Sequence, residues 1–272
     1  MTTTPASHRV AAIQMVSGDS LQANLDAASR LVAEAAWRGA QLVALPEYFY
    51  LMPADEPRRV ALAEPFGDGP IQRHLTGLAR THRVWLIGGT VPLQSLAPGR
   101  IYNSSLLFDP QGECAARYDK VHLFGFHHGE QHYDEAATMC AGREPVVAST
   151  PLGRLKLSVC YDLRFPEFYR LPPAPELIAA PAAFTRTTGE AHWELLLRAR
   201  AVENLAYVIA AGQGGEHPGG KQTFGHSMIV DPWGKVLDCV ASGEGIALAD
   251  IDLALQAELR CRLPALSHRV FP

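Results

Sequence analysis

Short apolar runs alternate with helical patterns at the start of the chain. Residues 10–15 and 42–45 are apolar runs of strand length, and between them residues 24–38 carry apolar side chains at helical spacing. The same order recurs where a helical pattern at 71–82 leads into the apolar run at 84–89. Strands that alternate with helices pair into a sheet that helices cover. The pattern therefore predicts the α/β (α+β) class.

Hairpin patterns follow farther along the chain. Strand patterns at 102–109 and 114–119 are joined by an Asp-Pro-Gln-Gly turn at 109–112. After an irregular, histidine-rich segment that ends at Gly142, the pattern predicts one helix and several strands. The helix is expected at 191–204 and the strands at 155–159, 178–180, 207–211, 227–230 and 236–240. No linker or low-complexity stretch divides the chain, so we expect a single domain over residues 1–272.

Composition excludes several classes of protein. The 272 residues are 47% hydrophobic and 19% charged, a mixture typical of a packed globular chain. The formal net charge of −4 offers no positive field for nucleic acid. No run approaches the roughly 20 apolar residues that cross a bilayer, and the first eight residues are polar, so no membrane or export signal is indicated. Five cysteines without a CxxC pair favour a reducing cytoplasm.

Cys160 ends an apolar strand pattern and directly precedes a polar turn. At such a strand-to-helix elbow the side chain is exposed, and the N–H of Tyr161 points to where a tetrahedral oxyanion would form. This position is typical of a nucleophile. A free cysteine in an apolar run is more often a small core residue, so catalysis requires partners for the thiol elsewhere in the chain.

Two charged residues end other strand patterns. Glu47 follows the buried run at 42–45, where burial would raise its pKa into a range useful for proton transfer. Lys120 stands in a predominantly apolar setting, where a partly desolvated ammonium could stabilise an oxyanion. Each charge alone is as readily explained as a solvated loop residue. A base, a cation and a thiol together predict nucleophilic catalysis.

Three motifs carry a resemblance to a known family. The sequences ALPE at 44–47, YDKVHL at 118–123 and VCYDLRFPE at 159–167 resemble, in order and spacing, the Glu, Lys and Cys motifs of the nitrilase superfamily of carbon–nitrogen hydrolases. Four further stretches, at 181–184, 191–194, 198–204 and 225–234, continue the resemblance over nearly the whole chain. The resemblance implies a four-layer α-β-β-α sandwich.

The resemblance also implies catalytic roles. Cys160 would attack an amide carbonyl, Glu47 would take its proton, and Lys120 with the Tyr161 N–H would hold the oxyanion. A thioester acyl-enzyme would follow.

Members carry a second glutamate between the Lys and Cys motifs. Glu135 matches this position better than Glu130, because of its distance from Gly142. Glu130 remains the alternative. The second glutamate would orient Lys120 and the leaving group.

The walls of the substrate pocket are implied in the same way. Arg164 would either pair with Glu167 and brace the elbow, which we expect, or face a substrate carboxylate. Core packing is the alternative for the other wall positions. Those positions are Tyr48, Phe49, Tyr50, Phe184 and Thr185.

Histidines gather at 126–132, and imidazoles beside a carboxylate can bind zinc. Their spacing matches no helical metal motif, and the family uses no metal, so we expect neither a metal nor a cofactor. We expect His127 and His128 to shape a substrate-binding loop instead.

The helix predicted at 191–204 has the pattern of an amphipathic surface helix. In the family this helix lies near the subunit interface, and the terminal tail, here 263–272, often reaches over the partner. The resemblance therefore implies a homodimer.

Segments at 188–200 and 210–217 look most like the Nit branch of the superfamily, especially its deaminated glutathione amidases. The implied substrate is N-(4-oxoglutaryl)-cysteinylglycine, split to 2-oxoglutarate and cysteinylglycine. The nearest alternative is ω-amidase activity on 2-oxoglutaramate, followed by another amidase of the superfamily. A carbamoylase is less favoured because Leu163 stands where that group usually has an arginine.

An alternative of a different class is a non-catalytic scaffold or a thiol sensor on the same fold. The presence of Glu47, Lys120, Glu135 and Cys160 together argues against it, because a scaffold has no physical need for all four.

Overall fold

The computed structural model describes residues 7–128 and 131–270. One sheet contains β1 (Ser7–Gln14), β2 (Leu42–Ala44), β3 (Trp85–Ile87), β4 (Val91–Gln94), β5 (Ile101–Phe108), β6 (Cys114–Asp119) and β17 (Gly245–Asp252). The other contains β9 (Val146–Thr150), β10 (Gly153–Leu157), β11 (Leu177–Ala179), β12 (Tyr207–Ala210), β15 (Ser227–Val230) and β16 (Val236–Val240).

Helices and two small ribbons complete the described chain. The helices are α1 (Leu21–Trp37), α2 (Pro57–Ala61), α3 (Pro70–His82), α4 (Pro166–Arg170), α5 (Arg186–Asn204) and α6 (Leu253–Arg262). Short 3-10 turns are η1 (Glu135–Ala137), η2 (Cys160–Arg164) and η3 (Pro218–Gly220). The ribbons pair β7 (Gly125–His128) with β8 (Gln131–Asp134), and β13 (Gly214–His217) with β14 (Lys221–Phe224).

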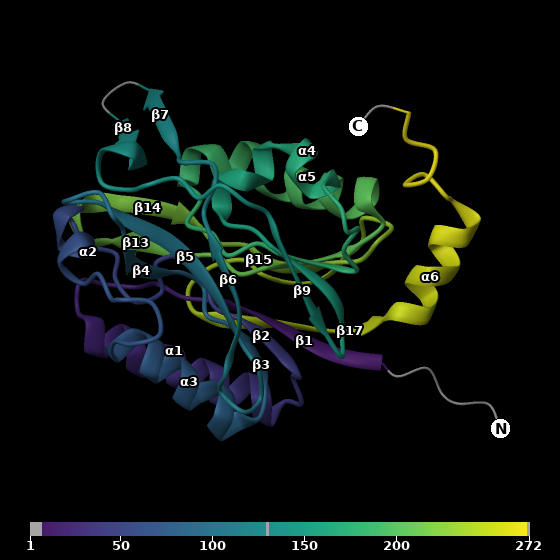
Figure 1. Cartoon of the computed structure of the whole chain (residues 1–272), viewed down its shortest axis with the longest axis horizontal. Helices are drawn as coiled ribbons and strands as arrows, with labels where there is room; N and C mark the ends of the chain where they lie inside the picture. Colours follow the sequence, from purple (N-terminus) through teal and green to yellow (C-terminus); the bar gives the residue numbers. More distant parts are fainter. Residues whose placement is uncertain (1–6, 129–130, 271–272) are drawn as a thin grey trace.

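The two sheets pack face to face between two layers of helices (Figure 1). The strand orders are β17-β1-β2-β3-β5-β4, with β6 beside β5, and β16-β15-β12-β11-β10-β9. Helices α1 and α3 cover the first sheet, and α4 and α5 cover the second (Figure 1). The four-layer sandwich expected from the resemblance is confirmed. Within the described residues, no helix is long and apolar enough to cross a bilayer.

Strand β1 shows why the core has two parts. Successive side chains of a strand point to opposite faces, and all of those at 10–13 are buried. Val10 and Ala12 join the core between the sheets, whereas Ala11 and Ile13 join the core under α1 and α3. An uninterrupted apolar run is therefore required, because both faces of this sheet are covered.

Two helices begin earlier than their apolar patterns predict. The Ser20 hydroxyl accepts a hydrogen bond from the Ala23 N–H, so α1 begins at Leu21 rather than near residue 24. The Thr185 hydroxyl accepts one from the Thr188 N–H, so α5 begins at Arg186 rather than at 191. In both cases a polar capping residue sets the first turn before the apolar face begins.

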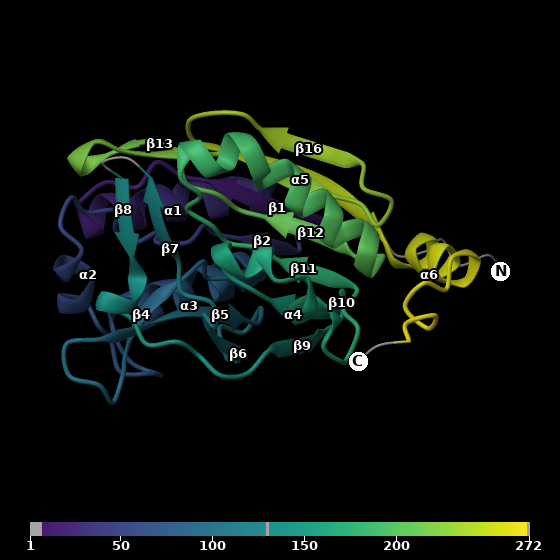
Figure 2. The same ribbon diagram turned by 90° about the horizontal axis from the view of Figure 1, so that it is seen from above.

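The histidine-rich segment is more regular than the sequence predicts. Instead of an irregular loop, β7 and β8 form an antiparallel ribbon with His127 opposite His132. This ribbon and the β13–β14 ribbon lie at one end of the sandwich, while α6 projects from the other end (Figure 2).

Candidate active site

Glu47 lies just beyond the carboxyl end of β2 and is 1% exposed. Its Oε1 accepts a hydrogen bond from Asn103 Nδ2 at 2.9 Å, and its Oε2 accepts one from the Ala183 N–H at 2.9 Å. Burial raises the pKa of Glu47; the nearby Glu135 carboxylate also raises it, and the Lys120 ammonium opposes the shift. A fixed carboxyl of raised pKa is suited to proton transfer.

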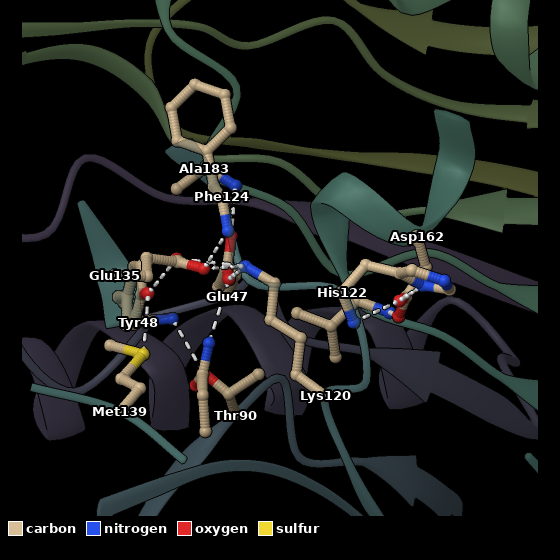
Figure 3. Close-up of polar contacts among 12 residues, drawn as sticks. Glu47, Tyr48, Thr90, Lys120, His122, Phe124, Glu135, Met139, Asp162 and Ala183 are labelled. Carbon is tan, nitrogen blue, oxygen red and sulfur yellow. Dashed lines mark hydrogen bonds and ion pairs between the residues drawn. The ribbon is translucent and has the colours of Figure 1, made fainter. Parts of the chain in front are cut away.

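Lys120 follows β6 and is buried beside two carboxylates (Figure 3). Its Nζ donates to Glu47 Oε1 at 2.9 Å and to the two oxygens of Glu135 at 2.9 and 2.8 Å. Burial opposes the charge, but the carboxylates of Glu135 and Glu47 outweigh it and raise the pKa of Lys120 above its usual value. Lys120 is therefore an ammonium held in a fixed place.

Glu135 begins η1, and both of its carboxylate oxygens accept hydrogen bonds from Lys120 Nζ. Its Oε2 accepts the Phe124 N–H at 2.7 Å, and its Oε1 accepts the Tyr48 hydroxyl at 2.6 Å (Figure 3). Burial alone would raise the pKa of Glu135, but Lys120 and these donors outweigh burial and lower it. The structure thus brings Glu135 to Lys120; the alternative, Glu130, lies outside the described residues.

Cys160 begins η2 with a positive φ of 50° and is 8% exposed. A left-handed backbone at a non-glycine residue is uncommon and costs energy; here the Cys160 N–H is held by the Pro181 carbonyl at 2.9 Å. Burial and then the charge of Glu47 raise the pKa of the thiol well above its usual range, and Lys120 opposes them. The resting thiol therefore keeps its proton until a base removes it.

Asp162 connects the segment around Lys120 to the strand-to-helix turn at Cys160. The sequence analysis did not identify Asp162 as a site residue. Its Oδ2 accepts the Tyr118 hydroxyl at 2.7 Å and the Val159 N–H at 2.8 Å. Its Oδ1 accepts the His122 ring Nδ1 at 2.7 Å and the His122 N–H at 3.2 Å (Figure 3). Asp162 stands three residues after Val159, the residue that precedes η2; an acidic residue at this position is a known capping pattern, and that signal could have identified it.

Close backbone contacts also hold the segments that carry Glu47 and Lys120. A Cβ on Gly89 would lie 2.1 Å from the carbonyl oxygen of Pro46, next to Glu47. A Cβ on Gly142 would lie 2.0 Å from the carbonyl oxygen of Asp119, next to Lys120. Only glycine fits at these two positions.

Glu47, Lys120 and Glu135 form a polar cluster. A cavity of about 110 Å³ lies over this cluster, and a smaller cavity of about 20 Å³ adjoins the first. The two cavities share Phe124, Cys160, Ala183 and Thr185. Glu47, Tyr48, Arg59, Tyr133, Glu135 and Lys221 line only the larger one, whereas Tyr161, Arg164, Phe184 and Thr188 line only the smaller one. The Cys160 thiol therefore stands where two cavities meet.

Arg164 is placed differently from the expected brace. Among the described residues, no ion pair joins it to Glu167; its guanidinium lies over the rings of Tyr161 and Phe184, 5.9 and 5.6 Å from their centroids. Its Nη2 is 3.3 Å from the Nδ1 of His192. Arg164 thus presents a charge to the smaller cavity, which is the arrangement that suits a substrate carboxylate.

Other predicted wall residues divide between cavity and core. Tyr48 lines the larger cavity, but Tyr50 does not: it is fully buried in the core, with its ring edge-on to Phe49. Core packing therefore describes Phe49 and Tyr50. His127 is exposed and is absent from both cavity walls, and of the His128 side chain nothing is described. Phe124, just before β7, and Tyr133, within β8, line the larger cavity instead.

The described residues contain no group of three or more His, Cys, Asp or Glu side chains that could hold a metal ion. The polar cluster is instead a carboxylate–ammonium–carboxylate arrangement beside a thiol. Such a set can abstract a proton, deliver a nucleophile and hold an oxyanion.

Comparison with known proteins gives consistent matches. Residues 9–260 match the carbon–nitrogen hydrolase family. The chain is 41% identical to a deaminated glutathione amidase of Yersinia enterocolitica, over 96% of this chain and 93% of that protein. It is 35% identical to an omega-amidase of Xenopus tropicalis, over 97% and 95%. The structure of Saccharomyces cerevisiae Nit3, a member of branch 10 of the nitrilase superfamily, superimposes with a TM-score of 0.86 at 30% identity, over 97% of each chain.

Proposed function

The chain belongs to the carbon–nitrogen hydrolase family, and on that premise we propose that it is an amidase acting through a Cys160 thioester. The observation that carries the proposal is the ion-paired cluster of buried Glu47 and Lys120 with Glu135, whose two carboxylates line the cavity that Cys160 also lines. Buried charges are costly unless they are paired. A scaffold or thiol sensor would gain nothing from this arrangement.

The first half of the reaction forms the thioester. Glu47 takes the thiol proton as the sulfur of Cys160 bonds to the amide carbon, and the carbonyl oxygen becomes an oxyanion. The Lys120 ammonium and the Tyr161 N–H stabilise that oxyanion. Glu47 then gives the proton to the amide nitrogen, the carbon–nitrogen bond breaks, and the amine leaves.

The second half releases the acid. Glu47 takes a proton from water, the hydroxide attacks the thioester carbon, and the carbon–sulfur bond breaks. The thiol is restored by the proton that Glu47 returns. The raised pKa of Glu47 supports both directions of this transfer, because a carboxyl of ordinary pKa is a weaker base.

We propose deaminated glutathione as the substrate, on the basis of the relatives so named and of Arg164. The acyl half of that substrate ends in a 2-oxo acid, and among the described residues Arg164 lines the smaller cavity without a carboxylate partner. Its guanidinium would bind the carboxylate of the acyl half. 2-Oxoglutaramate has the same acyl half, so ω-amidase activity is the second candidate, supported by the omega-amidase relative.

The test measures 2-oxoglutarate release from both substrates by wild type, Cys160→Ala and Cys140→Ala. Cys140 is a half-buried cysteine that lines neither cavity, so it is the matched control. We expect turnover by wild type and Cys140→Ala and none by Cys160→Ala. Full activity in Cys160→Ala would refute the thioester, and silence of the wild type on both substrates would refute the substrate class.

We also propose that the protein forms a homodimer, with the outer face of α5 at the dimer interface. We propose that it is located in the cytoplasm. Leu195, Val202 and Trp233 are 68%, 47% and 63% exposed and line one groove of about 660 Å³. Exposed apolar side chains that gather in one groove are typical of a contact with another chain. Light scattering should give twice the monomer mass for the wild type and a monomer for Trp233→Glu; a monomeric wild type would refute it.

A further inference from the structure

An outer cleft of about 420 Å³ joins the larger cavity over Cys160. The two share Tyr133, Thr185, Lys221 and Gln222, so the outer cleft directly adjoins the cavity that Cys160 lines. The cleft lies between the first turn of α5 and the η3–β14 segment. Its remaining wall consists of Arg186, Thr187, Glu190, Gly219 and Gly220.

We propose that this outer cleft binds the leaving group of the substrate, a peptide-like amine that ends in a carboxylate, and that Arg186 recognises that carboxylate. The inference rests on the proposed amidase function and deepens it. On this proposal, the outer cleft is the feature by which the enzyme prefers a substrate with a dipeptide leaving group over one that releases ammonia.

The geometry separates the two halves of the substrate at Cys160. The acyl half stays on the sulfur while the amine departs, so the two halves need different spaces. The space of about 20 Å³ beside Arg164 has room for little more than a carboxylate, so the guanidinium marks where the acyl half ends, and the rest of that half lies over Cys160. The outer cleft, which Arg164 does not line, then remains for the amine.

The size of the cleft exceeds what ammonia requires. A water-sized molecule takes about 30 Å³ in the liquid, whereas the outer cleft holds about 420 Å³. Sites for small organic ligands run from about 300 to 1,000 Å³. The outer cleft therefore has room for a leaving group of dipeptide size.

Solvent exposure distinguishes Arg186 from the other cations of this region. Arg59 and Lys221 share the single carboxylate of Glu56, and their side chains are only 5% and 21% exposed. Arg186 pairs with Glu190 at 3.1 Å, but the two side chains are 60% and 59% exposed. An exposed pair of this kind is weak, so a ligand carboxylate can replace Glu190 and form a bidentate contact.

The test compares kcat/KM for deaminated glutathione with kcat/KM for 2-oxoglutaramate. The variants are Arg186→Gln, which removes the charge, and Thr187→Trp, which fills the cleft from an exposed position. Arg262→Gln is the matched control, because Arg262 is also exposed and pairs with a glutamate one turn away, on α6 at the opposite end of the sandwich (Figure 2). A third substrate carries a carboxamide in place of the terminal carboxylate of the dipeptide.

We expect the ratio of the two kcat/KM values to fall about ten-fold in Arg186→Gln, mainly through KM, because a hydrogen-bonded charge is lost. Thr187→Trp should lower the same ratio. With the wild type, kcat/KM for the carboxamide substrate should be about ten-fold lower than kcat/KM for deaminated glutathione. Arg186→Gln should lower kcat/KM for the carboxamide substrate little further. The control should keep the wild-type ratio.

An unchanged ratio in both variants, with turnover of both substrates, would overturn the leaving-group site and leave the amidase intact. An equal fall for both substrates would also overturn it, since the effect would not be specific to the leaving group. Turnover of neither substrate by the wild type would refute the proposed function and this inference together.

Discussion

Replacing Asp162 by Asn tests whether one buried carboxylate connects the lysine and cysteine segments. Asp162 is fully buried and accepts four hydrogen bonds, two at each oxygen. An amide has one oxygen, so whichever way it turns, its NH2 faces a backbone N–H, that of His122 or that of Val159. One backbone donor then loses its acceptor.

The magnitude follows from these contacts. A buried donor without an acceptor costs about 1–3 kcal/mol, and bonds to a neutral acceptor are roughly half as strong as those to a carboxylate. We therefore expect Asp162→Asn to lower the free energy of unfolding by about 2–4 kcal/mol. Urea unfolding at neutral pH measures this loss.

The functional effect should be separable from the loss of stability. Asp162 touches neither the proposed oxyanion position nor the substrate, so we treat it as a positioning residue. With the elbow released from the Lys120 segment, we expect kcat to fall about 10- to 100-fold with little change in KM, since misplacement by about 1 Å can cost that much. The pH dependence of the rate of Cys160 alkylation by iodoacetamide in the folded protein should also differ from that of the wild type.

Asp26→Asn is the control, because Asp26 is exposed on α1 and bonds only Gln22 among the described side chains. It should match the wild type in all three measurements. If Asp162→Asn kept wild-type stability, kcat and alkylation profile, the connecting role of Asp162 would be wrong. Lower stability with an unchanged kcat and alkylation profile would reduce Asp162 to a structural residue.

Three further predictions concern charge, burial and close contact. Glu135→Gln removes a charge that raises the pKa of Glu47, so the acid limb of the kcat/KM profile should move to lower pH, and kcat should fall about 100-fold or more; an unmoved limb would contradict the coupling. Burial lowers the pKa of Lys156 from 10.5 to about 8, so folding carries a penalty that is complete below pH 8 and disappears as pH rises from about 8 to 10.5. Lys156→Met should therefore be more stable than wild type in urea at pH 7, by about 1–3 kcal/mol, and this advantage should shrink at pH 10; a constant difference would count against it. Gly89→Ala places a methyl group 2.1 Å from the Pro46 carbonyl oxygen at a φ of +57°, and we expect a loss of at least about 2 kcal/mol in urea unfolding, which a wild-type midpoint would rule out.

The order of strands and helices was accessible from the sequence because local patterns encode it. The apolar run at 10–15 had to be a strand buried on both faces, and β1 is one. The hairpin of β5 and β6 followed from the turn residues at 109–112. The placement of Glu47 and Cys160 at strand ends was also readable, since a polar residue that follows an apolar strand lies at the edge of its sheet.

Contacts between distant segments could not be read in the same way. Glu130 and Glu135 have the same chemistry, and although the spacing favoured Glu135, its contact with Lys120 depends on where the fold places η1. Nor could local sequence show that Arg164 lies over Tyr161 and Phe184 rather than against Glu167, because the ring of Phe184 comes from the distant segment between β11 and α5.

Burial and empty space are the properties that depend most on the assembled fold. Tyr48 and Tyr50 stand two residues apart with the same chemistry, yet one lines the cavity and the other fills the core, because the left-handed backbone at Tyr48 turns its hydroxyl toward Glu135. The outer cleft exists only where α5, β8 and the η3–β14 segment come together. A pattern of residues specifies which side chains avoid water, whereas the room left for a substrate is fixed by how the layers meet.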